Sequence, residues 1–245
     1  TAPNVWGRPV LDVAFDAQGY AYVAPVVVAP EGFDAYLAAA RLELLDGADP
    51  PYRVVQIFTD RPLTGDNRHR NSIREIEVDG AGNVYLLNAH ASNESDILWK
   101  FGADGTVLKT LIVGKPASGV RGRGRLALHV SADGGSVYVE PGQLDAADPD
   151  VSVLYGLSTA DLSLQRTVTV EGMPLVTAVA EDRQGVLWVT GLAVEDAPSP
   201  DSPFTAAYLA AAPVGINSVE AVRVSTGDCD LALPTSIVWT GTHLP

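Results

Sequence analysis

Short apolar or alternating runs, each ended by a turn that contains Asp and Gly, recur along the whole chain. The first is LDVAFDAQGYAYV, in which an alternating run leads into D-x-x-G and then into a second apolar run. The arrangement returns in IREIEVDGAGNVYL, LALHVSADGGSVYV and VTAVAEDRQGVLWV, so that the aligned glycines are Gly19, Gly82, Gly135 and Gly185. Alternation has the two-residue period of a strand, and Asp and Gly suit tight turns. Each copy therefore predicts a β-hairpin, although Asp133 comes late in the third copy and its turn is expected to differ.

Each predicted hairpin is followed by a second pair of strand-like runs. The pairs are RLELLD with YRVVQIF, DILWKFG with TVLKTLIV, SVLYGLS with LQRTVTV, and EAVRVS with TSIVWTG. Each repeat thus predicts a four-stranded antiparallel meander, and the repeats cover about residues 9–58, 72–113, 125–170 and 175–241. Such a period predicts an all-β fold, a β-propeller of four four-stranded blades forming one domain over residues 1–245. Four blades either close as a small ring or belong to a larger propeller.

One aromatic side chain recurs at the third position after each aligned glycine. These residues are Tyr22, Tyr85, Tyr138 and Trp188. Because they keep one register relative to the turn, they lie on one face of each second strand and are predicted to pack between adjacent blades.

The pattern D-x-x-G-x-[VLA]-[YW]-[VL], followed by an outer hairpin such as ILWKFGADGTVLKTLIV, resembles bacterial propeller repeats of the NHL and YVTN type. Gluconolactonase-like propellers are more distant relatives. The resemblance covers nearly the whole chain and implies the propeller fold. Those families include scaffolds, ligand binders, lyases and lactonases, so the resemblance implies no single activity.

Composition narrows the classes of partner. Acidic residues outnumber basic ones 30 to 16, which gives a net charge of −14 and argues against nucleic acid or an anionic membrane as partner. No apolar run is long enough to span a membrane. A chain that starts at Thr1 without methionine fits a mature exported protein, extracellular or periplasmic, and equally a trimmed piece of a longer chain. We expect export.

Positive charge gathers in two connections between the predicted blades. It is carried there by Arg61, Arg68, Arg70, Arg121, Arg123 and Arg125. Guanidinium groups bind carboxylate or phosphate in a bidentate manner, so these arginines are candidates to bind an anionic ligand at the channel mouth. Alternatively, they pair with acidic residues of neighbouring loops.

Candidate metal ligands are sparse. Asp145, Asp148 and Asp150 have the loose spacing of a calcium site, so they are candidate Ca²⁺ ligands. Apart from this candidate, the sequence predicts no cofactor. A gluconolactonase-like enzyme would need a divalent metal at the channel mouth, for which Asn88, His90 and Glu140 are candidates by position. There is no H-E-x-x-H, C-x-x-C or G-x-S-x-G motif, and His129, in the alternating run LALHV, is interpreted as structural.

The long connections of the first and last repeats share an apolar pattern, F-x-x-Y-L-A or F-x-x-x-Y-L-A. Its residues are Phe33, Tyr36, Leu37, Phe204, Tyr208 and Leu209. If these side chains reach outward, they form a patch that binds a partner protein; alternatively, they fold back as short helical turns over the core. We therefore predict an exported, non-catalytic propeller that binds another protein or a subunit of an assembly. The alternative is a metal-dependent lactonase or hydrolase of the gluconolactonase-like type.

Overall fold

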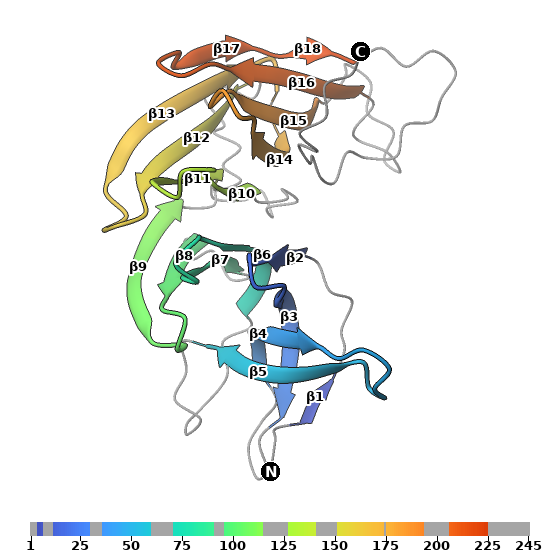
Figure 1. Ribbon diagram of the computed structural model, residues 1–245. Helices are drawn as coiled ribbons and strands as arrows, with labels where there is room; N and C mark the ends of the chain where they lie inside the picture. The colour runs from blue at the N-terminus through green and yellow to red at the C-terminus, as the bar shows by residue number, and fades with distance from the viewer. Residues whose placement is uncertain are drawn as a thin grey trace. The chain divides into compact units, whose positions relative to one another are not determined.

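A computed structural model of the protein describes residues 4–6, 12–29, 36–59, 71–90, 96–114, 127–140, 151–173, 175–193 and 206–224. Over these residues every regular element is a β-strand, and the strands form four sheets (Figure 1). Within the same ranges no helix is long and apolar enough to cross a membrane. The predicted fold class is confirmed: the chain is all-β, and its sheets are the four blades of a β-propeller. It divides into two compact units, residues 1–113 and 114–245.

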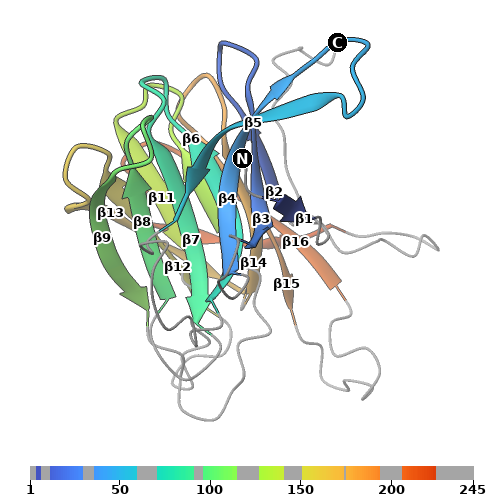
Figure 2. The same cartoon turned by 90° about the horizontal axis from the view of Figure 1, so that it is seen from below.

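The first unit holds blades 1 and 2. Blade 1 consists of β1 (Asn4–Trp6), β2 (Asp12–Phe15), β3 (Ala21–Ala29), β4 (Tyr36–Leu44) and β5 (Tyr52–Phe58). Blade 2 consists of β6 (Asn71–Val78), β7 (Val84–His90), β8 (Asp96–Phe101) and β9 (Val107–Gly114), in that order. Both β1 and β2 pair with β3, which lies between β2 and β4 (Figure 2), so the first strand of blade 1 is made in two pieces.

The second unit holds blades 3 and 4. Blade 3 consists of β10 (Ala127–Val130), β11 (Ser136–Glu140), β12 (Val151–Ser158) and β13 (Leu164–Glu171). Blade 4 consists of β14 (Leu175–Glu181), β15 (Leu187–Ala193), β16 (Ala206–Ala212) and the short β18 (Val222–Arg223). The strand just before β18, β17 (Ser218–Glu220), leaves blade 4 and pairs in parallel with β13 of blade 3.

The strand assignment of the fourth repeat was wrong. EAVRVS is not its third strand, because AAYLAAA forms β16 and pairs along its whole length with β15. This run was assigned to a connection because it shares the Y-L-A pattern with the connection of the first repeat. Packing on a sheet overrides the weak helix preference of its alanines. TSIVWTG lies outside the described residues.

The recurring Asp and aromatic residues form one hydrogen-bonded unit. In blade 2, Oδ1 of Asp79 accepts from the backbone N–H groups of Ala81 and Asn83, each at 2.9 Å, while Oδ2 accepts from Tyr85 Oη at 3.1 Å. Asp16 with Tyr22, and Asp182 with Trp188 Nε1, repeat the arrangement at 2.9 and 3.0 Å. The glycine of each turn has positive φ, from 78° to 84°. The motif therefore holds the hairpin and orients the aromatic ring.

The third turn differs, as expected, and shows that its copy was aligned one residue too far along. Gly134, not Gly135, is the residue with positive φ, and Ser131 takes the place of the turn aspartate. The backbone N–H of Ser131 bonds to the carbonyl of Ser136, one residue further on than in the other turns. Tyr138 follows this longer turn and is buried.

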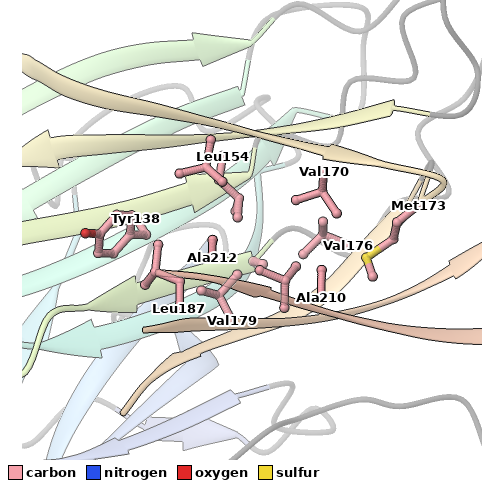
Figure 3. Packing of buried hydrophobic residues seen from close by; sticks show 12 residues of the cluster. Tyr138, Leu154, Val170, Met173, Val176, Val179, Leu187, Ala210 and Ala212 are labelled. Carbon is pink, nitrogen blue, oxygen red and sulfur yellow. The ribbon is translucent and has the colours of Figure 1, made fainter. Parts of the chain in front are cut away.

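Within each unit two blades pack face to face. The first core includes Ala14, Tyr22 and Phe58 of blade 1 and Ile76 and Leu86 of blade 2. The second joins blades 3 and 4 (Figure 3), with Tyr138, Leu154, Val170, Val179 and Leu187 among its members. The prediction that the aromatics pack between blades is confirmed for Tyr22 and Tyr138, which lie in these cores.

Side chains of the first strands add polar contacts between blades. Asp12 Oδ2 accepts from the backbone N–H of Ile76 at 2.8 Å, and His129 Nε2 accepts from the backbone N–H of Glu181 at 3.1 Å. His129 thus joins two blades, which is the structural role expected for it.

Candidate functional site

Most residues predicted to bind an anion or a metal lie outside the described residues. These are Arg61, Arg68, Arg70, Arg121, Arg123 and Arg125, together with Asp145, Asp148 and Asp150. Asn88 and His90 lie in β7, paired with Ile73 and Asn71, and Glu140 ends β11 with a buried side chain. Across the described ranges, no group of three or more His, Cys, Asp or Glu residues is arranged to hold a metal ion.

The residues predicted to bind a partner do not form outward-reaching loops where they are described. Phe33 and Phe204 lie outside the described residues. Tyr36 and Leu37 begin β4, where they pair with Val28 and Val27. Tyr208 and Leu209 lie in β16, and Tyr208 packs against the core between blades 3 and 4. The structure therefore corrects their placement to strands and excludes the helical turns considered for these four residues.

One face of blade 1 carries an apolar surface with exposed side chains. Cross-strand partners share a face of a sheet, and the register places Val13 beside Val23, Phe15 beside Ala21, and Leu42 beside Val54. Ala14, Tyr22 and Phe58 point the other way, into the core with blade 2. The opposite surface, which we call the blade-1 outer face, is formed by Val13, Phe15, Val23, Leu42, Val54 and Ile57.

Alanine forms the floor of this surface, and large side chains stand at its margin. Ala38 and Ala40 are fully buried beneath Val23, Leu42, Val54 and Ile57. Val13 is 47% exposed and Phe15 is 61% exposed, and the paired Leu44 and Tyr52 extend the surface at 57% and 41%. A contiguous apolar patch rimmed by polar residues is typical of a protein interface.

A second apolar face lies on blade 4, and on it Ala180 is buried, with 6% exposure. Ala180 pairs with Trp188, which pairs with Ala211; Thr190 pairs with Leu209, which pairs with Val222. These six residues form the blade-4 outer face, opposite the side on which Val179, Leu187 and Val189 meet blade 3. Trp188, Thr190, Leu209 and Ala211 are half-buried, and Val222 is 68% exposed.

The sequence analysis missed both faces for one reason. The runs that form these strands were interpreted only as blade strands, and their pattern does not predict how far each face is exposed. No signal in the sequence distinguishes these strands from strands that a neighbouring blade covers.

Comparison with known proteins supports the fold. The chain is similar to hydrazine synthase from Kuenenia stuttgartiensis, with a TM-score of 0.54 and 10% identity over 90% of this chain and 67% of that one. An exo-beta-1,3-galactanase from Clostridium thermocellum matches with a TM-score of 0.45 and 14% identity, over 85% of this chain and 47% of that one. For a gluconolactonase from Xanthomonas campestris the TM-score is 0.38 and the identity 14%, over 87% and 84%. No protein-family model and no curated protein matches. At these identities, the likeness to hydrazine synthase shows a propeller fold and carries no activity.

Proposed function

We propose that the chain is a non-catalytic binding or assembly module that docks another protein through the blade-1 outer face. The observation that carries the proposal is the exposure of Phe15, 61%, beside Val13, 47%, on a sheet face with no polar side chain among its six defining residues. Removing such side chains from water is the main driving force of protein association.

The use of the repeated carboxylates supports a scaffold rather than a reaction centre. Asp16, Asp79 and Asp182 all accept hydrogen bonds from their own turns and from the aromatic residue that follows. The acidic groups that recur in the sequence are thereby engaged in holding hairpins.

The proposal keeps several finer expectations. We expect Phe33 and Phe204 to extend the partner-binding surface, the six arginines to bind an anionic segment of the partner, and Asp145, Asp148 and Asp150 to bind calcium. We also expect the chain to be related to the NHL and YVTN repeats and to act in the extracellular or periplasmic space.

The test is site-specific photo-crosslinking in the source cells. A photoreactive phenylalanine analogue at Phe15 should form a crosslink whose partner peptide mass spectrometry identifies. The same analogue at Leu164, which is 59% exposed on β13, is the matched control and should form none. Equal crosslinking at both positions, or none at Phe15, would refute docking at this face. Hydrolysis of a lactone or ester by the purified chain with a divalent metal would replace the binding proposal by the enzyme alternative.

The connection before β16 can be tested for partner binding only by a change that leaves β16 in place. Because β16 begins at Ala206, deleting residues 196–212 would remove a blade strand. Replacing only residues 196–204 with a Gly/Ser linker leaves β16 intact. If those residues contact the partner, the crosslink yield at Phe15 should fall while the protein keeps its melting temperature.

A further inference from the structure

Two hydrogen bonds that join blades 3 and 4 meet at one residue, Glu181, where β14 ends. Its backbone N–H donates to Nε2 of His129 on β10 at 3.1 Å, and its Oε2 accepts from the backbone N–H of Ala132 at 2.8 Å. Both blades belong to the same compact unit, residues 114–245, so this contact is internal to the unit. One residue of blade 4 is therefore bound to blade 3 through both its main chain and its side chain.

His129 lies at the margin of the core between the two blades. Its cross-strand partner is Tyr138, which is buried in that core, and cross-strand partners share a face of a sheet. Val179, two residues before Glu181 on β14, lies in the same core. His129 and Glu181 are themselves half-buried, so solvent protons can reach the imidazole although the bond is partly shielded from water.

The donor to His129 is a backbone amide, and this fixes the protonation state of the ring. An amide N–H can only donate, so Nε2 must carry a lone pair, and the neutral ring must hold its proton on Nδ1. In an imidazolium both ring nitrogens are donors, and two N–H groups would then face each other. Uptake of one proton by His129 therefore removes the bond from Glu181.

The groups around His129 are mostly carboxylates. The titratable and charged residues on the surrounding elements are Tyr138 and Glu140 of β11, Asp133 of the turn after β10, and Glu181, Asp182 and Arg183 at the end of β14. Hydrogen bonds, the largest from Ser131 and Trp188 respectively, hold the pKa values of Asp133 and Asp182 below the ordinary 3.8. Of the side-chain types in this cluster, histidine is the one that ordinarily changes charge between about pH 5 and about pH 8.

We infer that His129 is a pH-sensitive switch in the contact between blades 3 and 4. The neutral imidazole accepts from the amide of Glu181 and holds the first strands of the two blades together. The imidazolium cannot accept, and its charge attracts the carboxylate of Glu181 in competition with the amide of Ala132. One proton thus acts on both bonds.

The switch loosens the contact on acidification and does not unfold the blades, because the apolar core beside it does not titrate. The stability that the two bonds contribute is present while His129 is neutral and is lost as the pH falls through its titration. The switch involves blades 3 and 4 alone and is independent of the docking face on blade 1.

NMR spectra of the backbone amides of the full chain, recorded at steps between about pH 5 and about pH 8, test the switch. We expect the amide signals of Glu181 and Ala132 to move with the midpoint at which the ring signals of His129 titrate. The protection of the Glu181 amide against hydrogen exchange, corrected for the intrinsic effect of pH, should fall about fivefold on protonation of His129, as for the loss of one ordinary hydrogen bond.

Two conservative variants separate a switch from a merely structural contact. His129→Gln places an amide oxygen near the position of Nε2 and does not titrate, so the amide signals of Glu181 and Ala132 should stay constant over this range. Glu181→Gln keeps the main chain but removes the charge, so the amide of residue 181 should still follow His129 while that of Ala132 should not. The matched control is His90→Gln on β7 of blade 2, in which both amides should titrate as in the unmodified chain.

Three results would each overturn the switch: a His129 ring that does not titrate in this range, a Glu181 amide whose signal and protection ignore that titration, or a Glu181 amide that titrates unchanged in His129→Gln. Circular dichroism verifies that each variant is folded. If His129→Gln does not fold, the Glu181 and Ala132 amides of the unmodified chain and of Glu181→Gln still decide between the two outcomes.

Discussion

Replacing Asp79 by alanine should destabilise blade 2 strongly, because its buried carboxylate accepts several hydrogen bonds from the turn and from Tyr85. Asp79 is 8% exposed, and it accepts from the N–H groups of Ala81 and Asn83, from Asn83 Nδ2 at 2.8 Å and from the hydroxyl of Tyr85. Hydrogen bonds to a charged group contribute about 1.5 to 3 kcal/mol each, but several bonds to one group are not additive. We expect a loss of about 3 kcal/mol in the free energy of unfolding, well above the effect of an ordinary surface change.

The aromatic partner allows the contribution to be divided. Tyr85→Phe keeps the ring, which is 0% exposed, and removes the hydroxyl, so it should cost about 1 kcal/mol. The double variant should lose about 1 kcal/mol less stability than the sum of the losses of the two single variants. This difference is the coupling expected of a direct hydrogen bond. Urea unfolding followed by circular dichroism measures all three variants, and Asp46→Ala, in the exposed turn of blade 1, is the control. A loss below about 0.5 kcal/mol for Asp79→Ala, as for a typical surface site, would refute the role given to this motif.

Two further predictions concern the same motif in blade 4. The hydrogen bond from Trp188 is the largest cause that holds the pKa of Asp182 below its ordinary value of 3.8, and with the turn backbone it outweighs burial, which raises the pKa. The ionised carboxylate of Asp182 therefore contributes to stability above pH 3.8, and this contribution is lost as the pH falls through the lowered pKa. The urea midpoint should depend less on pH in the acid range for Asp182→Asn than for the unmodified chain. Identical pH curves for the two proteins would contradict this. A Cβ at Gly185, where φ is +78°, would also lie 2.9 Å from Val214 Cγ2, whereas at Gly19, φ +84°, it meets nothing within 4 Å. Both alanine variants should lose about 1 kcal/mol from backbone strain, and thermal melts should show the larger loss for Gly185→Ala; the reverse order would rule out the steric argument.

The repeat was predictable because its turn chemistry is local. D-x-x-G followed by an aromatic residue at a fixed distance encodes both the bend and the hydrogen bond that holds it, so β2, β6, β10 and β14 fall within two residues of the predicted first strands. The third turn shows the limit of this argument. Two adjacent glycines offer two alignments, and only the backbone shows that Gly134 has the positive φ.

The fourth blade could not be predicted in detail because its strands are decided by packing. AAYLAAA has no alternation, and it becomes a strand because β15 offers it a partner along its whole length. The different exposure of equivalent residues could not be predicted either. Val13 and Ile76 are both branched and apolar, but Val13 is 47% exposed whereas Ile76 is buried in the core between blades 1 and 2. The predicted anion and metal residues stay predictions, because they fall outside the described ranges.

The short segment from Asn217 to Val224 has a consequence for how the last two blades open. Its first part, up to Ala221, bonds to β13 of blade 3: the amide of Thr169 donates to the carbonyl of Asn217, and the amide of Ala221 donates to the carbonyl of Glu171. Its second half pairs with β16 of blade 4, where the amide of Val224 bonds to the carbonyl of Ala207. Because one continuous segment pairs with both sheets, blades 3 and 4 cannot separate from each other without breaking its bonds to one of them, so they should behave as one cooperative folding unit. In native-state hydrogen exchange, the amides of Thr169, Ala221 and Val224 should open together rather than blade by blade.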